Sequence, residues 1–160
     1  MQYYHLRKVD ELVKENVELR TTLGRDYLIK PDVVVALPGR HDDEPAFLHA
    51  AISCKWTIRS DRVQNIRHEN NQMIRHRRER LPHLMTVTSE PLPSRLAAIA
   101  RGTGEVDAVY HVAFDNLDRA VTNLAARKQL SLDQVEAWLE VTSLGRVRPF
   151  SDLAETLALW

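Results

Sequence analysis

The sequence has little of the features that mark secreted or membrane proteins. It contains a single cysteine, Cys54, among 160 residues. No disulfide can therefore form within the chain, which fits a reducing, cytoplasmic setting. Its longest apolar runs, such as "DVVVAL" at 32–37, are far too short to cross a membrane. The start of the chain has no apolar segment of the kind found in secretory signals. We therefore expect a cytoplasmic protein with no membrane partner.

The chain also has no excess of charge, since it carries 22 basic and 22 acidic residues. This balance argues against a general, non-specific nucleic-acid binder. Hydrophobic residues make up 44% of the sequence and charged residues 28%, a composition typical of soluble globular proteins. A chain of this length can bury a core of its own without disulfides. We predict a single domain over residues 1–160.

The charges are nevertheless unevenly distributed along the chain. Residues 55–80 contain eight Lys and Arg residues against three Asp and Glu residues. A basic stretch on a neutral body can bind anions such as DNA phosphates. Arginine-rich helix faces that simply meet solvent are more common, so charge alone does not establish a binding site.

The pattern of apolar residues and turn signals predicts alternating helices and strands. Helices are predicted at 5–20, 61–80, 93–102, 115–128, 131–142 and 150–160, and strands at 28–37, 46–58, 84–90 and 106–114. Ser60 or Asp61 is the predicted N-cap of the second helix, and a short turn favours pairing of the first two strands. This order predicts an α/β fold with a mixed central sheet flanked by helices.

Polar side chains interrupt the first two predicted strands. Asp32 lies at the start of an apolar strand, where a carboxylate is costly to bury unless it is paired or binds a metal. In the next strand, alternation places Ser53 and Lys55 on one face and Cys54 and Trp56 on the other. We expect Cys54 and Trp56 to lie in the core. Considered singly, Asp32 could simply face solvent at the start of its strand. Lys55 could likewise be a lysine at a strand end whose side chain extends to water.

The helix that follows carries an acid near its apolar face. Apolar residues recur at helical spacing over 63–74, and either Glu69 or Asn70 fills the gap in that stripe. Glu69 taken singly is equally consistent with pairing to a nearby arginine. Together, however, Asp32, Lys55 and Glu69 come from two neighbouring strands and the next helix. Two carboxylates suit a hard cation such as Mg²⁺, and a nearby lysine can orient water and offset charge on a phosphate.

The spacing of these residues resembles a known nuclease pattern. Pro31-Asp32, the run "SCK" at 53–55 and Glu69 are similar to the PD-(D/E)xK nuclease arrangement, and more narrowly to restriction endonucleases of the NgoMIV type. In that family a serine replaces the acid two positions before the lysine, and the following helix supplies the lost carboxylate. Here Ser53 occupies that slot and Glu69 lies fourteen residues after Lys55.

The resemblance implies roles for individual residues. Asp32, Ser53, Lys55 and Glu69 would be catalytic. Asp32, Glu69 and the backbone carbonyl of Cys54 would bind Mg²⁺. The fold implied is the restriction-endonuclease-like α/β fold. The family also has a longer N-terminal portion and a longer spacing between the aspartate and the serine. We therefore expect a shortened hairpin and a truncated front portion.

A second motif follows the lysine. In this family an Arg-x-Asp-Arg element reads a CCGG core in the major groove, so Arg59, Asp61 and Arg62 would recognise bases. The chemistry agrees, because arginine can donate two hydrogen bonds to guanine and an acid can accept from cytosine. Asp61 could also cap the helix and pair locally with Arg59 or Arg62, which would be an added role and not a rival to base reading. Arg67 and Arg75 are possible phosphate contacts, although solvated arginines explain them as well.

These features predict a Mg²⁺-dependent type II restriction endonuclease acting on double-stranded DNA. Its site would be palindromic with a CCGG core, similar to GCCGGC. Cutting a palindrome requires two copies of the reading element, so we expect a homodimer or homotetramer. Two alternatives stay open: a non-cleaving, truncated DNA-binding remnant of such an enzyme, and a structural α/β domain whose charged turn has no such role.

Overall fold

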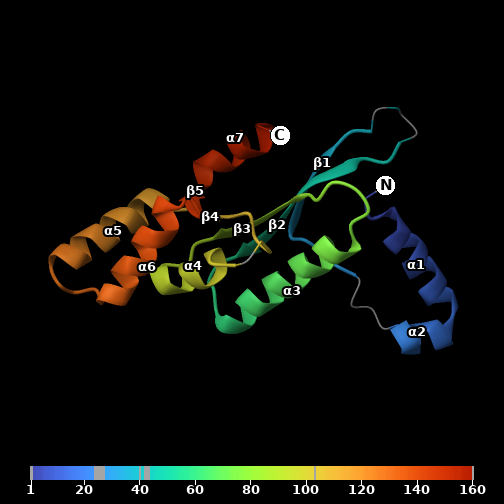
Figure 1. The fold of residues 1–160 in the computed structure, drawn as a ribbon, viewed down its shortest axis with the longest axis horizontal. Coiled ribbons are helices and arrows are strands. Elements are labelled where there is room, and N and C mark those ends of the chain that lie inside the picture. Colours follow the sequence, from blue (N-terminus) through green and yellow to red (C-terminus); the bar gives the residue numbers. More distant parts are fainter. Residues whose placement is uncertain (1, 24–27, 40, 42–43, 103, 160) are drawn as a thin grey trace.

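A five-stranded sheet forms the centre of the molecule. The computed structural model describes residues 2–23, 28–39, 41, 44–102 and 104–159. The strands lie in the order β1-β2-β3-β4-β5 (Figure 1). They are β1 (Val33–Leu37), β2 (Phe47–Lys55), β3 (His83–Thr88), β4 (Ala108–His111) and β5 (Val147–Pro149). Strand β1 pairs antiparallel with β2, and the other pairs are parallel. The predicted mixed α/β sheet is therefore confirmed.

Helices connect the parallel strands, as is usual for the crossovers between such strands. They are α1 (Tyr4–Glu15), α2 (Val17–Leu23), α3 (Ser60–His76), α4 (Pro93–Ala100), α5 (Phe114–Ala126), α6 (Leu132–Ser143) and α7 (Leu153–Ala158), with a short 3₁₀ turn, η1 (Phe150–Asp152), before the last. Helix α3 joins β2 to β3, and α4 joins β3 to β4. Helices α1 and α2 lie at the right of the view, on the opposite side of the molecule from α5 and α6 (Figure 1). None of the helices in the described part of the chain is long and apolar enough to span a membrane.

Several predicted boundaries shift for local reasons. The first strand begins at Val33 rather than at 28, because Pro31 has no N–H to donate to a ladder. The first helix is divided at Asn16, whose extended backbone ends α1 and whose Oδ1 accepts the N–H of Leu19 in α2. The predicted caps Ser60 and Asp61 are wrong, since both lie inside α3 and no side chain caps that helix. The three-residue strand β5 was not predicted, because it is too short to show alternation.

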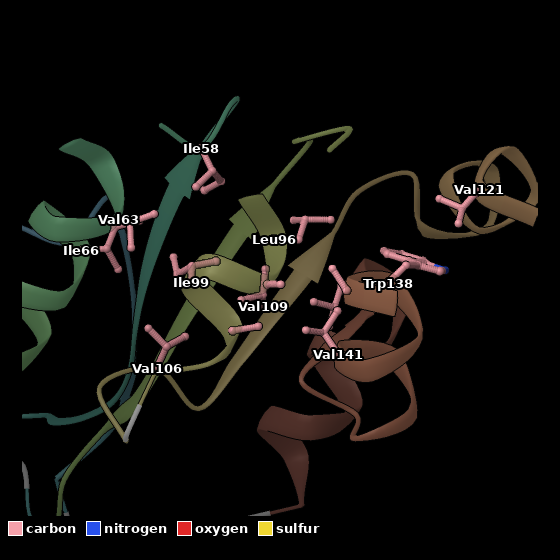
Figure 2. Close-up of a cluster of buried hydrophobic side chains, with 14 residues drawn as sticks. Ile58, Val63, Ile66, Leu96, Ile99, Val106, Val109, Val121, Trp138 and Val141 are labelled. Carbon is pink, nitrogen blue, oxygen red and sulfur yellow. The ribbon is translucent and has the colours of Figure 1, made fainter. Parts of the chain in front are cut away.

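One face of the sheet carries the main core. Buried side chains from α3, α4, α5 and α6 pack there with residues of β4 and β5 (Figure 2). Its largest members are Ile58, Ile66, Leu96, Ile99, Val109 and Trp138. A second cluster on the opposite face comprises Ala50, Ile52, Met85, Ala108 and Tyr110, against which Leu153 and Leu157 of the η1–α7 region pack. The sheet is thus covered broadly on one face and narrowly on the other.

This unequal covering overturns the prediction that Cys54 and Trp56 are core residues. Cys54 is exposed, and the Trp56 side chain is 79% exposed. Cys54 shares its face with Ile52, but the apolar residues of α7 do not extend to the end of β2. Trp56 follows the last residue of β2, where strand alternation no longer applies. Ser53 is instead buried, on the same helix-covered face as Ala51.

Candidate functional site

Four chain segments meet at one edge of the sheet, which we call the functional edge. Because β1 runs opposite to its neighbours, its start lies beside the end of β2, with Val33 opposite Ile52. The parallel strands β3 and β4 end beside β2, with Lys55 opposite Thr88 and Thr88 opposite His111. Ligand sites in open α/β sheets form at such strand ends. The topology therefore brings Asp32 and Lys55 together at this edge.

Asp32 and Lys55 form the central contact of the functional edge. The Nζ atom of Lys55 lies 2.6 Å from Oδ2 of Asp32, and the backbone N–H of Cys54 donates to the same oxygen at 2.7 Å. The Asp32 side chain is 43% exposed and that of Lys55 is 26% exposed. The other carboxylate oxygen, Oδ1, has no hydrogen-bond partner among the described residues. Asp32 therefore holds Lys55 through Oδ2, and its Oδ1 is open to a ligand.

The surroundings of Asp32 stabilise its ionised form. The hydrogen bond from Lys55 is the largest cause of a lowered Asp32 pKa, and the Cys54 N–H lowers it further. Partial burial opposes this shift without reversing it. Asp32 is therefore a carboxylate throughout the neutral range, as metal binding would require. Burial raises the pKa of the neighbouring Cys54 thiol, and the Asp32 charge raises it further, so this cysteine is not activated as a nucleophile.

Asn70, rather than Glu69, occupies the buried position in the α3 stripe. Asn70 is 4% exposed, and its Nδ2 donates to the Glu105 carbonyl at 2.7 Å. Glu69 is half-buried, with no hydrogen bond or ion pair within the described ranges. No contact joins Glu69 to Asp32 or Lys55 there. The structure thus brings Asp32 and Lys55 together, while the inclusion of Glu69 stays a prediction.

The Arg-x-Asp-Arg segment lies directly beyond the functional edge. Arg59 is exposed immediately before α3, and Asp61 is exposed in its first turn. Arg62 is half-buried, and its Nη1 donates to the carbonyl of Thr57 at 2.8 Å and to its hydroxyl at 3.1 Å. Three charged side chains therefore lie within seven residues of Lys55, two of them open to solvent and one held against the connecting loop.

Comparison with known proteins gives the family of the chain. A model described as "NgoMIV restriction enzyme" matches residues 1–46 and 36–159. The chain is also 38% identical, over 183 residues, to a protein of Neisseria gonorrhoeae named "Type II restriction enzyme NgoMIV". The chain belongs to the NgoMIV restriction enzyme family. The predicted resemblance and the restriction-endonuclease-like fold class are therefore confirmed.

The NgoMIV relative is longer than this chain. The alignment covers 99% of this chain but 62% of the relative. It also extends over more positions than the 160 residues present here, so the aligned part of the relative includes residues with no counterpart in this chain. The two matches to the family model overlap at 36–46, which includes the end of β1 and most of the turn to β2. This agrees with the predicted shortening of the hairpin.

Two further arginines have different environments in this NgoMIV-family fold. Arg67 is half-buried, and its Nη2 donates to the Ala98 carbonyl at 2.8 Å, so it joins α3 to α4. That contact gives Arg67 a structural role that the sequence did not indicate. Arg75 is exposed in the last turn of α3, where its charge also favours the helix C-terminus. Phosphate contact therefore stays a better prediction for Arg75 than for Arg67.

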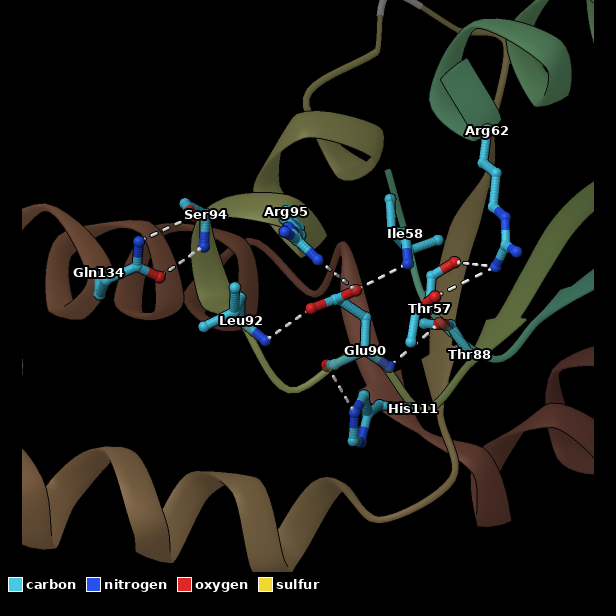
Figure 3. Close-up of polar contacts among 10 residues, drawn as sticks. All are labelled: Thr57, Ile58, Arg62, Thr88, Glu90, Leu92, Ser94, Arg95, His111 and Gln134. Carbon is cyan, nitrogen blue, oxygen red and sulfur yellow. Dashed lines mark hydrogen bonds and ion pairs between the residues drawn. The ribbon is translucent and has the colours of Figure 1, made fainter. Parts of the chain in front are cut away.

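Sequence reasoning missed Glu90, the most completely buried charged residue at the functional edge. Its side chain is 1% exposed. Oε2 accepts the N–H of Ile58 at 2.7 Å, and Oε1 accepts the N–H of Leu92 at 3.1 Å (Figure 3). The sequence pattern placed Glu90 only at the end of the predicted strand at 84–90. The available signal was an acid directly after an apolar strand and before a Pro-x-Pro turn, where exposed backbone N–H groups need acceptors.

Residues that could hold a metal form only a partial ligand set. Within the described ranges, no group of three or more His, Cys, Asp or Glu side chains is placed to hold a metal ion. Mg²⁺ is commonly bound by one or two carboxylates, with water completing its shell. The free Oδ1 of Asp32 and its ionised state suit that chemistry. His111 does not, because both its ring nitrogens are engaged, with the Glu90 carbonyl and the Ala113 N–H.

Proposed function

We propose that this chain is a Mg²⁺-dependent type II restriction endonuclease that hydrolyses double-stranded DNA at a palindromic site with a CCGG core, similar to GCCGGC. The observation that carries the proposal is the Asp32–Lys55 pair at the functional edge, followed at once by the charged segment of Arg59, Asp61 and Arg62. Family membership supports the same activity. A nuclease needs a phosphate-directed centre beside a base-reading element, and the residues at and just after the end of β2 are suited to both.

The geometry of α3 supports a place for Glu69 in this centre. Residues two positions apart lie on opposite flanks of a helix. Since Arg67 bonds to the Ala98 carbonyl of α4, Glu69 would lie on the flank of α3 that is turned away from α4, and we assign that flank to the Asp32 side. Helix α3 returns antiparallel along β2, and Met73 shares a core cluster with Ala51. One helical turn and two strand residues span about the same 6 Å, so Glu69 is level with Ser53.

We assign metal binding to Asp32, Glu69 and the backbone carbonyl of Cys54. Bound Mg²⁺ would supply Lewis-acid stabilisation of the phosphate and an activated water. Lys55 would orient that water and offset negative charge on the phosphate undergoing attack. Ser53, which is buried near the end of β2, would support the site. The Lys55 Nζ atom contacts Asp32 Oδ2, so the ammonium lies beside the carboxylate that would hold the cation.

Base reading is assigned to the segment after the lysine. Arg59 and Arg62 would each donate two hydrogen bonds to a guanine, and Asp61 would accept from cytosine amino groups. Arg62 would exchange its bonds with Thr57 for bonds with the base. Arg75 would contact the phosphate backbone. A palindromic site needs two such elements related by a two-fold axis, so we propose that the active form is a homodimer or a homotetramer.

A plasmid experiment tests the proposal. Supercoiled DNA carrying GCCGGC and other CCGG-containing palindromes is incubated with the protein, with Mg²⁺ or with EDTA. Discrete, Mg²⁺-dependent fragments with ends at a CCGG core are expected. A protein that binds such DNA specifically but leaves it uncut under all metal conditions would instead be the non-cleaving remnant. A protein that neither binds nor cuts would contradict both functions.

A further inference from the structure

Glu90 is an unusual residue to bury at the functional edge. Its carboxylate accepts backbone N–H groups from two segments, and Nη1 of Arg95 lies 3.6 Å from Oε2. Its own backbone is held as well, because Glu90 N–H donates to the Thr88 hydroxyl and its carbonyl contacts Nε2 of His111 (Figure 3). Burying a carboxylate is costly unless its hydrogen bonds are complete. Here both oxygens accept hydrogen bonds, which offset the free-energy cost of burying the carboxylate.

The partners of Glu90 show what this arrangement holds. Ile58 is fully buried and immediately precedes Arg59. Thr57, which precedes Ile58, is the residue to which Arg62 is hydrogen-bonded. The short bond from Ile58 N–H to Glu90 therefore lies at the base of the segment 57–62. The bond to Leu92 joins the same carboxylate to the residue before α4.

We propose that Glu90 is a positioning residue for base reading. By holding Ile58 against the end of β3, its carboxylate sets the position from which Arg59, Asp61 and Arg62 leave the sheet. This inference rests on the proposed function, since it concerns how the CCGG core would be read. Glu90 itself touches no substrate, being 1% exposed at the side chain. Its effect is transmitted through the backbone of residues 57–59.

The Glu90→Gln variant isolates this role. An amide has a single acceptor oxygen, whereas Glu90 accepts Ile58 N–H and Leu92 N–H on separate oxygens. The substitution keeps size and shape but leaves one of the two N–H groups without its present acceptor. The matched control is Val121→Ala, which removes buried core volume from α5. Val121 and Ile58 belong to the same core but lie at opposite sides of it (Figure 2), so the control loosens the fold at a distance from the segment 57–62.

The test compares binding of two duplexes in Ca²⁺, one with a GCCGGC site and one with the core scrambled, well below each variant's melting temperature. We expect Glu90→Gln to weaken binding of the GCCGGC duplex by about tenfold, the loss typical of a displaced bidentate base contact. Its affinity for the scrambled duplex should match that of the wild type. Val121→Ala should keep the wild-type ratio of the two affinities, even if its melting temperature falls as far as that of Glu90→Gln.

Each outcome decides the matter. A wild-type ratio in Glu90→Gln, with the wild type discriminating, overturns the positioning role and leaves the proposed function intact. A wild type that binds both duplexes equally overturns the proposed function, and this inference with it. If Glu90→Gln does not fold, Glu90→Asp is measured instead. It keeps the charge and both oxygens, but its reach is one methylene shorter. A wild-type ratio in Glu90→Asp would likewise overturn the inference.

Discussion

Asp32 and Glu90 are two carboxylates at the same edge of the sheet, and each accepts a backbone N–H from the end of β2 or just beyond it. The two bonds have the same length, 2.7 Å, from Cys54 to Asp32 and from Ile58 to Glu90. They differ in exposure, since the Asp32 side chain is 43% exposed and that of Glu90 is 1% exposed. Asp32 keeps one oxygen open, whereas Glu90 uses both.

This difference separates two tasks that a nuclease must perform. An exposed carboxylate with an open oxygen can bind a cation and change partners during a reaction. A buried carboxylate with complete hydrogen bonds holds its neighbours still. Along the charged run "SCKWTIRSDR" at 53–62, Asp32 therefore holds Lys55, to which we assign catalysis. Glu90 holds Ile58, at the base of the segment to which we assign base reading. The predictions below test whether the two tasks are separable.

The largest effect is expected from Lys55→Ala. Loss of the ammonium that orients water and offsets phosphate charge should lower the single-turnover cleavage rate by about 10³-fold or more. Affinity for a CCGG duplex should change little, because Lys55 reads no base. The free energy of unfolding should fall by no more than about 1 kcal/mol, as is usual for a partly exposed ion pair. Gel-based cleavage and urea titration measure these quantities, and a cleavage rate within tenfold of the wild type would refute the role.

Glu90→Ala should have the largest effect on stability. Removal of the buried carboxylate leaves the N–H groups of Ile58 and Leu92 without acceptors, and we expect a loss of about 3 kcal/mol in the free energy of unfolding. Glu140→Ala is the control, because Glu140 pairs with Arg101 at the surface. That exposed pair, screened by solvent, should contribute much less to stability. Equal losses in the two variants, measured by urea unfolding, would contradict the contrast between buried and exposed carboxylates.

The lowered pKa of Asp32 predicts a small dependence of stability on pH. Because the folded-state pKa lies below the unfolded value, the contribution is complete above the unfolded pKa and is lost as pH falls through the folded one. The wild type should therefore exceed Asp32→Asn in stability at neutral pH, by less than about 1 kcal/mol for so exposed a group. The difference should shrink below about pH 4. Metal-free unfolding curves at several pH values test this, and a difference that grows on acidification would be inconsistent with it.

The smallest effect is expected from Cys54→Ala. The thiol is exposed on the thinly covered face of the sheet, and its roles here belong to the backbone N–H and carbonyl, which alanine retains. The free energy of unfolding should change by no more than about 0.5 kcal/mol, as is usual for surface substitutions. Cleavage should be unchanged. A loss of several kcal/mol would restore the original interpretation of Cys54 as a core residue.

The parts of the fold that were predictable are those with strong local signals. Apolar periodicity identified α3 and its buried residues Val63, Ile66 and Met73, and a short turn signal identified the pairing of β1 with β2. The motif spacing predicted that Asp32 and Lys55 come together, and the structure shows their contact. These features depend on residues close in sequence or on a recognisable family pattern.

The parts that were not predictable depend on what covers each face of the sheet. Alternation correctly divided Ser53 and Lys55 from Cys54, but it could not say which face the helices would bury. Cys54 is exposed, contrary to the prediction, because the helical cover on its face is a single short helix, α7. Glu90 was missed for a related reason. Its partners, Ile58 and Leu92, come from separate loops whose meeting is a property of the tertiary structure alone.

One measurement tests the central claim that the two carboxylates have separate tasks. Asp32→Asn and Glu90→Gln are compared in single-turnover cleavage at saturating GCCGGC duplex in Mg²⁺, with affinities for that duplex measured in parallel. The account predicts that Asp32→Asn binds as the wild type does and cuts at least about 10²-fold more slowly. Glu90→Gln should bind about tenfold more weakly and cut at nearly the wild-type rate once bound. The opposite pattern, or equal losses of binding and cleavage in both variants, would contradict the account.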